Sequence, residues 1–254
     1  MAIDEWLLDR AVRSSRVDAP SPLAALRFYT WSRPTLSLGF HQRHLHPRWS
    51  ELARRGEVLL VRRPSGGRAV LHAGELTYAL VWPQAPARRR EAYRAACAWL
   101  QQGFADLGLP LQFGAEPADP LHPSCFATST AADLIQRQGG KRIGSAQLWR
   151  HGVLLQHGSI LLQPDPALWQ RVLGEDAPRL VPLDRPVEDL IDALQRAARS
   201  HLPIAAVDWS SRPLAPQDWS RIAARRSRYR VAWEEVDTTP DRGVRPPAEP
   251  PRRS

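Results

Sequence analysis

The stretch from Gly139 to Leu162 holds the residues best suited to chemistry in this chain. Lys141 is the only lysine among the 35 basic side chains, and all the others are arginine. An ammonium is a compact point charge with three rotatable donors, whereas a guanidinium is a wide planar fork. Three small residues follow at Gly144, Ser145 and Ala146, where bare backbone lets a ligand approach closely. We predict that Lys141 acts at a substrate site, with a solvated hairpin lysine as the alternative.

A glycine-rich loop, RRPSGGRAV, is the second stretch with chemical potential. Two glycines at the end of a strand let successive backbone N–H groups turn toward an anion or a carbonyl. The loop matches neither the GxxxxGK[ST] pattern nor GxGxxG. Its candidate ligand contacts are Arg63, Ser65, Gly66, Gly67, Arg68 and Ala69. Taken alone, the pattern favours an ordinary glycine-rich turn with solvated arginines.

The two cysteines differ in their surroundings. Cys97 lies on the apolar face of a helical pattern, which predicts a core position. Cys125 lies in a loop after Pro123, 16 residues ahead of Lys141. A nearby cation lowers the pKa of a thiol and makes it a nucleophile, so Cys125 is a candidate catalytic residue. A buried and inert cysteine is the alternative.

Two histidines accompany the glycine-rich elements. His72 ends one apolar strand pattern, and His157, followed by Gly158, interrupts another, so these residues are candidates for lining a pocket. A structural role in the core is the alternative. The closely spaced histidines at positions 41, 44 and 46 lack helical i, i+4 spacing and adjacent carboxylates, so we predict no metal site.

Periodicity predicts the elements that position these residues. Strands are expected at 23–31, 35–40, 57–62, 69–72, 76–82, 109–113, 133–138, 142–147 and 153–163, and helices at 3–11, 47–55, 87–107, 166–173, 187–200 and 215–228. This order predicts an α+β fold, a mixed sheet flanked by helices. We expect one catalytic domain at 1–237, with 174–237 as its helical C-terminal part. The Pro- and Arg-rich stretch at 238–254 is expected to be a disordered tail.

Composition narrows the function classes. The 254-residue chain is 43% hydrophobic, and no apolar run reaches the 18 or so residues that span a bilayer. Its acidic, amphipathic start differs from a signal peptide, so we expect a cytoplasmic protein without membrane association. The net charge of +9 favours acidic partners. The arginines are scattered rather than grouped, so we expect no specific nucleic-acid binding, although an arginine-rich nucleic-acid binder is the remote non-enzyme alternative.

Three motifs in order carry a family resemblance: RRPSGGRAVLHAGELTYAL, SCF and GKRIGSAQLWRHGVLLQHGSILL. Together they resemble the signatures of the biotin/lipoate protein ligase and transferase catalytic domain, a fold related to class II aminoacyl-tRNA synthetases. The similar region covers about residues 3–173. The resemblance implies that the RRxSGG loop and the HGSILL strand line an acyl pocket. It also implies that Lys141 contacts the acyl carbonyl or an activated phosphate.

Two chemistries occur in that family. Lipoate ligases use ATP and Mg²⁺ to form an acyl-adenylate and need no cysteine. Cysteine-dependent octanoyltransferases take the acyl group from acyl carrier protein through an enzyme thioester. The form GGRAVLH…ELTY and the Cys125–Phe126 pair resemble the second kind, although Ser65 stands where many such transferases have threonine.

The resemblance therefore implies an octanoyl or lipoyl transferase that needs no cofactor. Octanoyl-acyl carrier protein would be its donor. The acceptor would be a lipoyl domain of a 2-oxoacid dehydrogenase complex or the glycine cleavage H protein. An ATP-dependent lipoate-protein ligase is the alternative.

Overall fold

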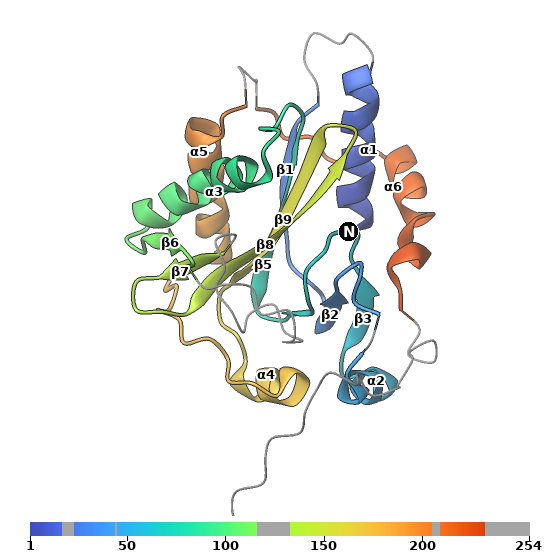
Figure 1. The fold of residues 1–254 in the computed structure, drawn as a ribbon, viewed down its shortest axis with the longest axis vertical. Helices are drawn as coiled ribbons and strands as arrows, with labels where there is room; N and C mark the ends of the chain where they lie inside the picture. Colours follow the sequence, from blue (N-terminus) through green and yellow to red (C-terminus); the bar gives the residue numbers. More distant parts are fainter. Residues whose placement is uncertain (17–22, 44, 116–132, 205–208, 232–254) are drawn as a thin grey trace, which may run out of the picture.

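The computed structural model describes residues 1–16, 23–43, 45–115, 133–204 and 209–231 (Figure 1). The strands within these ranges are β1 (Ala25–Tyr29), β2 (Thr35–Leu38), β3 (Leu59–Arg62), β4 (Val70–His72), β5 (Glu75–Trp82), β6 (Leu111–Phe113), β7 (Leu134–Gln136), β8 (Lys141–Arg150) and β9 (Val153–Leu161). The helices are α1 (Ala2–Arg16), α2 (Pro47–Arg54), α3 (Arg89–Asp106), α4 (Pro166–Leu173), α5 (Val187–His201) and α6 (Pro216–Ala223), with a 3₁₀ turn η1 (Arg226–Tyr229).

The strands form two sheets. The larger has six strands in the order β1-β5-β9-β8-β7-β6, and every pairing in it is antiparallel. The smaller has the order β3-β2-β4, with β2 parallel to β3 and antiparallel to β4. The central strands β5 and β9 are buried along their whole length, so helices must cover both faces of the larger sheet.

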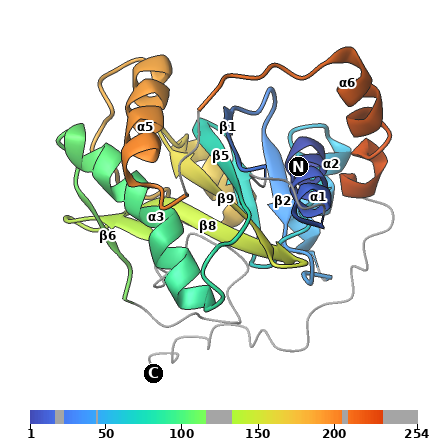
Figure 2. The same cartoon turned by 90° about the horizontal axis from the view of Figure 1, so that it is seen from above.

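Helices α3 and α5 lie on one face of the larger sheet, and α1 lies on the other (Figures 1 and 2). The apolar stripe of α3, which includes Cys97 and Phe104, packs with α5 on the main core. Helices α2 and α4 pack with the smaller sheet around a second core. Asp165 caps α4 by accepting hydrogen bonds from the first-turn amides, and Gly174 ends it in the left-handed conformation.

Strand alternation sorts the side chains of β9 between the two faces. Gln156 points toward α3, where its Nε2 lies 3.3 Å from Cys97 Sγ. His157 points the other way, toward Asp4 of α1. In β8, Ala146 pairs with His157 and therefore shares its face. Lys141 differs from Ala146 by an odd number of positions, which places it at the α3 side of the strand.

Strand β8 changes neighbours along its length. In the described part of the chain, β7 pairs with β8 at Lys141 and Ile143, whereas the residues from Gly144 to Arg150 pair with β9 alone. This second half of β8 forms one wall of the site described below. Because β7 does not pair with this half of β8, side chains on either face of the strand can contribute to that wall.

The α+β prediction is confirmed, and most predicted elements are present with bounds shifted by a few residues. The smaller sheet is the mixed one, whereas every pairing in the larger sheet is antiparallel. The consecutive strands β1 and β2 belong to different sheets. The helix expected at 215–228 is two elements, because α6 stops at Ala223 and η1 follows. The segments at 116–132 and 232–254, which include Cys125 and the predicted tail, lie outside the described residues.

Candidate functional site: a cavity between the glycine-rich loop and β8

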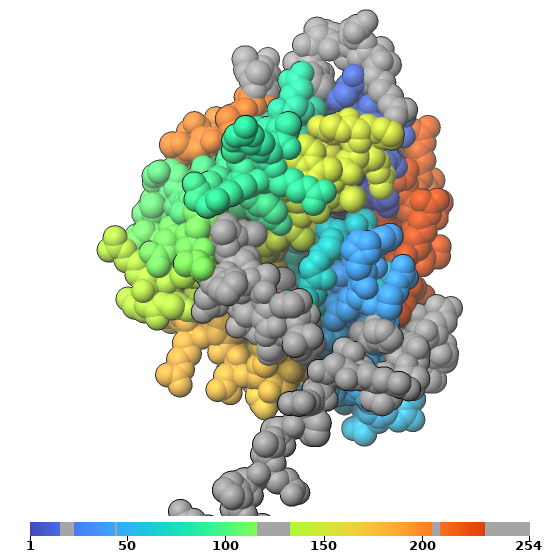
Figure 3. Space-filling model, viewed as in Figure 1, coloured from blue at the N-terminus to red at the C-terminus, as the bar shows by residue number. Residues whose placement is uncertain are grey.

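A cavity of about 700 Å³ lies between the glycine-rich loop that follows β3 and the second half of β8. On the face shown in Figure 3, the yellow-green surface of the β8–β9 hairpin lies between the green surface of α3 and the blue surface near β2 and β3. Ten of the predicted site residues line this cavity: Arg63, Ser65, Gly66, Gly67, His72, Gly144, Ser145, Ala146, His157 and Gly158. Two separate sequence motifs therefore meet at one place.

The remaining predicted site residues lie elsewhere. Among the described residues that line the cavity, Arg68, Ala69 and Lys141 are absent. Ala69 is fully buried in the core of the smaller sheet, and the backbone oxygen of Arg68 accepts a hydrogen bond from Arg63. Cys125 lies outside the described residues, so its role stays a prediction.

Arg63 fixes the shape of the glycine-rich loop. Its guanidinium donates to the backbone oxygens of Ser37 at 2.8 Å, Gly66 at 2.9 Å and Arg68 at 2.6 Å. The residue is only 4% exposed, so these carbonyls satisfy donors that would otherwise be buried without partners. Arg63 therefore supports the loop from within, besides contributing to the cavity wall.

The loop also packs against β2 through bare backbone. A Cβ atom built on Gly39 would lie 1.7 Å from the backbone oxygen of Gly67, which no side chain tolerates. Gly67 has a positive φ of 90°, a conformation suited to glycine. The amide of Phe40 donates to the oxygen of Ser65 at 2.9 Å. The end of β2 thus holds the loop against the cavity.

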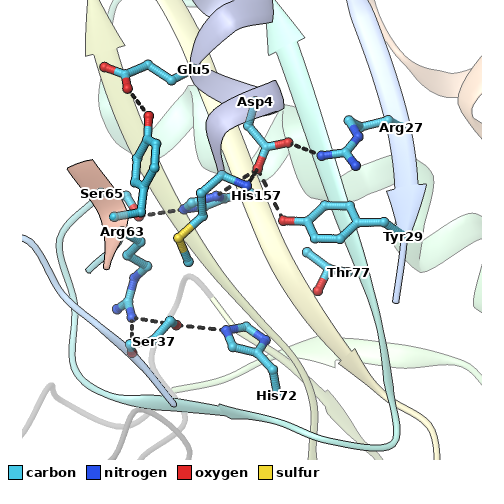
Figure 4. Close-up of polar contacts among 12 residues, drawn as sticks. Asp4, Glu5, Arg27, Tyr29, Ser37, Arg63, Ser65, His72, Thr77 and His157 are labelled. Carbon is cyan, nitrogen blue, oxygen red and sulfur yellow. Dashed lines mark hydrogen bonds and ion pairs between the residues drawn. The ribbon is translucent and has the colours of Figure 1, made fainter. Parts of the chain in front are cut away.

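A buried polar cluster joins α1 to the cavity (Figure 4). Asp4 is fully buried and receives hydrogen bonds from Arg27 at 2.5 Å and from Tyr29 at 3.1 Å. Burial alone would raise the pKa of Asp4, but the chain's amino group, His157 and Arg27 hold it well below its usual value. His157 Nδ1 faces Asp4 Oδ2 at 4.0 Å, and its Nε2 lies 2.5 Å from Ser65 Oγ.

A second cluster of the same kind lies nearby. His72 Nε2 is 2.7 Å from Ser37 Oγ, and its Nδ1 is 2.5 Å from Glu75 Oε1. Thr77 donates to the same carboxylate oxygen at 2.7 Å. The ring of Trp31 stacks on His72 with centroids 4.3 Å apart. His72 is thus held from three directions.

Lys141 is 4% exposed, and its Nζ lies 2.9 Å from Asp133 Oδ2. The pair lies at the junction of β7 and β8, immediately after residues 116–132. Removing one member of a buried pair typically costs about 3–5 kcal/mol, because the other charge loses its partner. The solvated hairpin lysine is therefore excluded as an account of Lys141.

The α3 side of the hairpin holds a neutral hydrogen-bond network. Tyr78 Oη lies 2.8 Å from Ser145 Oγ and accepts from Gln156 Nε2 at 2.9 Å. Burial raises the pKa of the Cys97 thiol to about 12, so the predicted core position of this cysteine is confirmed. A thiol with that pKa is not a nucleophile at neutral pH.

Sequence reasoning missed several groups of the site, chiefly Ser37 and Thr77, which line the cavity, and Asp4, which lies behind His157. Asp4 carried a recognisable signal, because it shares the helical stripe of Leu8 and Ala11, which are fully buried. A carboxylate on an apolar stripe needs a buried partner. The partners Arg27 and Tyr29 lie on β1, and only the fold shows that they approach α1.

No group of three or more His, Cys, Asp or Glu side chains is positioned to hold a metal ion within the described part of the chain. His46, one of the three closely spaced histidines, caps α2 by accepting a hydrogen bond from the amide of Arg48. No helix among the described residues is long and apolar enough to cross a membrane.

Comparison with known proteins gives a consistent result. Residues 1–207 match the family model described as the lipoyl protein ligase A/B catalytic domain. The chain is 38% identical over 195 residues to octanoyltransferase LipM of Symbiobacterium thermophilum, covering 73% of this chain and 68% of the relative. It is 34% identical over 231 residues to octanoyltransferase LipM of Brevibacillus brevis, covering 86% and 77% respectively.

Several further relatives of that name match over 61–64% of their own length. Among solved structures, a lipoate protein ligase homologue from T. acidophilum with bound lipoic acid superimposes with a TM-score of 0.69. That match covers 89% of this chain and 90% of the other at 20% identity, so it supports the fold alone.

Proposed function

We propose that this chain, which belongs to the lipoyl protein ligase A/B catalytic domain family, transfers an octanoyl group to a lysine of a lipoyl domain. The observation that carries the proposal is the identity of 34–38% to octanoyltransferases, combined with a cavity formed by the motifs that carry the resemblance. A volume of about 700 Å³ falls in the range of about 300–1,000 Å³ that is usual for small-molecule sites.

The acyl chain would lie along the apolar part of the cavity wall, which includes Trp31, Val70 and Leu148. Its carbonyl would lie near the backbone of Gly66 and Gly67, where N–H groups can donate to an oxyanion. The bare backbone at Gly144 on the opposite wall permits a close approach. The lining fits a flexible acyl tail with one polar end.

Cys125 and Lys141 would carry the covalent step. Cys125 would attack the carbonyl carbon of the donor thioester, so that the acyl group moves to the enzyme and the carrier thiol leaves. Lys141 Nζ, positioned by Asp133, would stabilise a nearby thiolate or oxyanion. This transfer would require no cofactor.

Octanoyl-acyl carrier protein would be the donor, and the acceptor would be a lipoyl domain of a 2-oxoacid dehydrogenase complex or the glycine cleavage H protein. The net charge of +9 supports the docking of acidic partners, because complementary charge speeds encounter and suppresses wrong partners. These reactions would occur in the cytoplasm.

Intact mass spectrometry tests the proposal. The protein mixed with octanoyl-acyl carrier protein should gain one octanoyl group, and the Cys125→Ala variant should gain none. Cys97→Ala is the matched control, because its buried thiol is not a nucleophile. That variant should still form the adduct, and a lipoyl domain added afterwards should remove the group from the enzyme.

The same measurement separates the transferase from an ATP-dependent ligase. A ligase would instead form an acyl-adenylate from free octanoate, ATP and Mg²⁺, and would acylate the lipoyl domain without an enzyme adduct. Wild-type protein that forms the adenylate and never the thioester would contradict the transferase proposal.

A further inference from the structure

Helix α3 begins at the edge of the cavity with a cluster of four exposed arginines, Arg88, Arg89, Arg90 and Arg94. Arg89 itself lines the cavity, as does Tyr93 one turn later. Tyr93 Oη donates to the backbone oxygen of Ser145 at 3.1 Å, which ties the start of α3 to the second half of β8. In Figure 3 the green surface of α3 adjoins the yellow-green surface of the β8–β9 hairpin. The α3 arginine cluster therefore lies at the rim of the cavity.

The charges of this cluster are unfavourable for the helix itself. The first turn of a helix carries a partial positive charge, so acidic side chains stabilise it and basic side chains do not. Helices α1, α5 and α6 have acids in their first turns, and α4 is capped by Asp165. The first turn of α3 has Glu91 as its one acid, and its N-cap residue, Arg88, makes no side-chain cap hydrogen bond. A local charge pattern that opposes the helix points to a function for those charges.

The arginines that line the cavity differ in their partners. Arg63 is buried and donates to backbone oxygens of the glycine-rich loop. Arg150 is paired with two carboxylates of α1. Within the described ranges, the one ion pair of the α3 arginine cluster joins Arg88 to Glu91 at 3.4 Å, between two well exposed side chains. The cluster, with Arg89 on the cavity wall, therefore presents a net positive charge to solvent.

We propose that the α3 arginine cluster docks the acidic carrier protein that presents the octanoyl thioester. Complementary charge beside a site speeds the encounter of two proteins and orients the partner. The planar guanidinium also matches the geometry of the carboxylates that such a partner exposes. This inference rests on the proposed function, because it assigns a surface to the donor of that reaction.

The position of the cluster favours the donor over the acceptor. Three of its four arginines are absent from the cavity wall, so a partner held by them lies to one side of the cavity. An acyl carrier protein holds its acyl group on a long flexible arm, which can extend from that side into the cavity. The acceptor lysine has a short side chain and belongs to the lipoyl domain itself, so that domain must lie directly over the cavity.

Charge reversal in the cluster tests the inference. The α3 variant, Arg88→Glu/Arg90→Glu, changes two arginines that do not line the cavity. The α5 variant, Arg196→Glu/Arg199→Glu, is the matched control, because it changes the net charge equally at exposed positions that do not line the cavity. Octanoyl transfer to a lipoyl domain is measured at low ionic strength with two donors. One is octanoyl-acyl carrier protein, and the other is octanoyl-pantetheine, which has no carrier protein.

The value of kcat/KM for the carrier-bound donor should fall at least about tenfold in the α3 variant, because charge steering typically contributes 10–10³-fold to association. It should change little in the α5 variant. Wild type and both variants should use octanoyl-pantetheine equally, and the KM for the lipoyl domain should stay the same. Added salt should reduce the difference between wild type and the α3 variant, because salt screens exposed charges.

Arg88→Gln/Arg90→Gln keeps the test open if charge reversal disturbs the helix, and it should show part of the same loss. Thermal unfolding provides an independent check of the fold. Removal of positive charge from the first turn should leave the melting temperature unchanged or raise it. A loss restricted to the carrier-bound donor in such a folded variant supports docking.

Unchanged kcat/KM for the carrier-bound donor in the α3 variant, an equal loss in the α5 variant, or an equal loss with octanoyl-pantetheine would overturn the inference. A raised KM for the lipoyl domain alone would overturn it too, because the cluster would then dock the acceptor. These outcomes leave the proposed function standing, since the wild type still transfers octanoyl groups. Absence of transfer by the wild type from either donor would instead reject the proposed function itself.

Discussion

At the scale of single residues, Lys141 gives the most direct prediction. Its ammonium is 4% exposed and paired with Asp133, so the surrounding space is matched to a small cation. A guanidinium is wider and directs its donors differently. We expect Lys141→Arg to lose about 10²–10³-fold in rate, as is typical when a preorganised donor is removed. Steady-state octanoyl transfer measures this loss.

The matched control is Arg54→Lys, which replaces arginine by lysine at an exposed position of α2. This variant should keep the wild-type rate. Thermal unfolding of each variant separates a rate effect from a folding defect. Turnover close to wild type in Lys141→Arg would remove Lys141 from the mechanism.

Asp4 predicts a pH dependence of stability. Its folded pKa is lowered, so the carboxylate stabilises the fold above its unfolded value of about 3.8. This stabilisation is lost as the pH falls through the lower folded value. Asp4→Asn leaves Arg27 without its partner and should cost about 3 kcal/mol at pH 7.

Urea unfolding of wild type and Asp4→Asn at pH 7, 4 and 3 should show that the difference between them shrinks below pH 4. Asp192→Asn, an exposed position on α5, should show no such difference at any of these pH values. A constant difference for Asp4→Asn would assign its effect to packing rather than charge.

At the scale of elements, the packing of the glycine-rich loop against the end of β2 requires that Gly39 has no side chain. A methyl group on Gly39 would overlap the backbone oxygen of Gly67, so the loop must move away from β2. Overpacking of this kind costs about 1–3 kcal/mol. Gly66→Ala is the matched control, because its Cβ would meet nothing within 4 Å. We expect a lower melting temperature in Gly39→Ala and little change in Gly66→Ala.

The measurement is thermal unfolding followed by circular dichroism. Equal melting temperatures for the two variants would show that the loop accommodates the methyl group without cost. The comparison concerns stability alone, since Gly66 lines the cavity.

Elements were largely predictable from sequence because their signals are local. The apolar period of α3, ended at Gly108, and the alternation along β5 follow from side-chain direction alone. His157 was identified because it interrupts an apolar strand. Strand order and sheet membership were not predictable, because they depend on contacts between distant segments.

The dependence on contacts between distant segments also explains which site residues could be predicted from the sequence. Family motifs brought Ser65, Gly144 and His157 into one group, and they line one cavity. Asp4 was noticed only as part of the acidic, amphipathic start of the chain. Its partner Arg27 lies 23 residues away, and no local pattern joins the two. The face of β8 on which Lys141 lies became clear only from the strand register.

At the scale of the whole molecule, the segment from 209 to 231 returns to the site, although the family model ends at residue 207. Arg225 pairs with Asp9 of α1 at 2.6 Å, and Tyr229 donates to Glu5. The amide of Val231 donates to the oxygen of Leu60 in β3. This segment therefore joins α1 to the smaller sheet.

Truncation tests how much the C-terminal part contributes. Removal of everything after Thr239 should leave the melting temperature unchanged, because the last residues are rich in Pro and Arg and hold one large apolar residue, Val244. A drop of several degrees in this variant would show that the tail packs on the domain.

Removal of everything after Ile204 should have the opposite effect. It deletes Tyr229 as a partner of Glu5 and Arg225 as a partner of Asp9, although both carboxylates keep Arg150, and it exposes apolar surface that Ile222 and Tyr229 now cover. Each lost hydrogen bond to a charged group costs about 1.5–3 kcal/mol, and a chain of this size loses about 2–4 °C of melting temperature per kcal/mol. The two lost bonds therefore predict a decrease of roughly 6–24 °C. Octanoyl transfer should fall as well, because Glu5 lines the cavity and would lose Tyr229. Tyr229→Phe should reproduce part of this loss, and equal melting temperatures for the two truncations would show that the segment is dispensable.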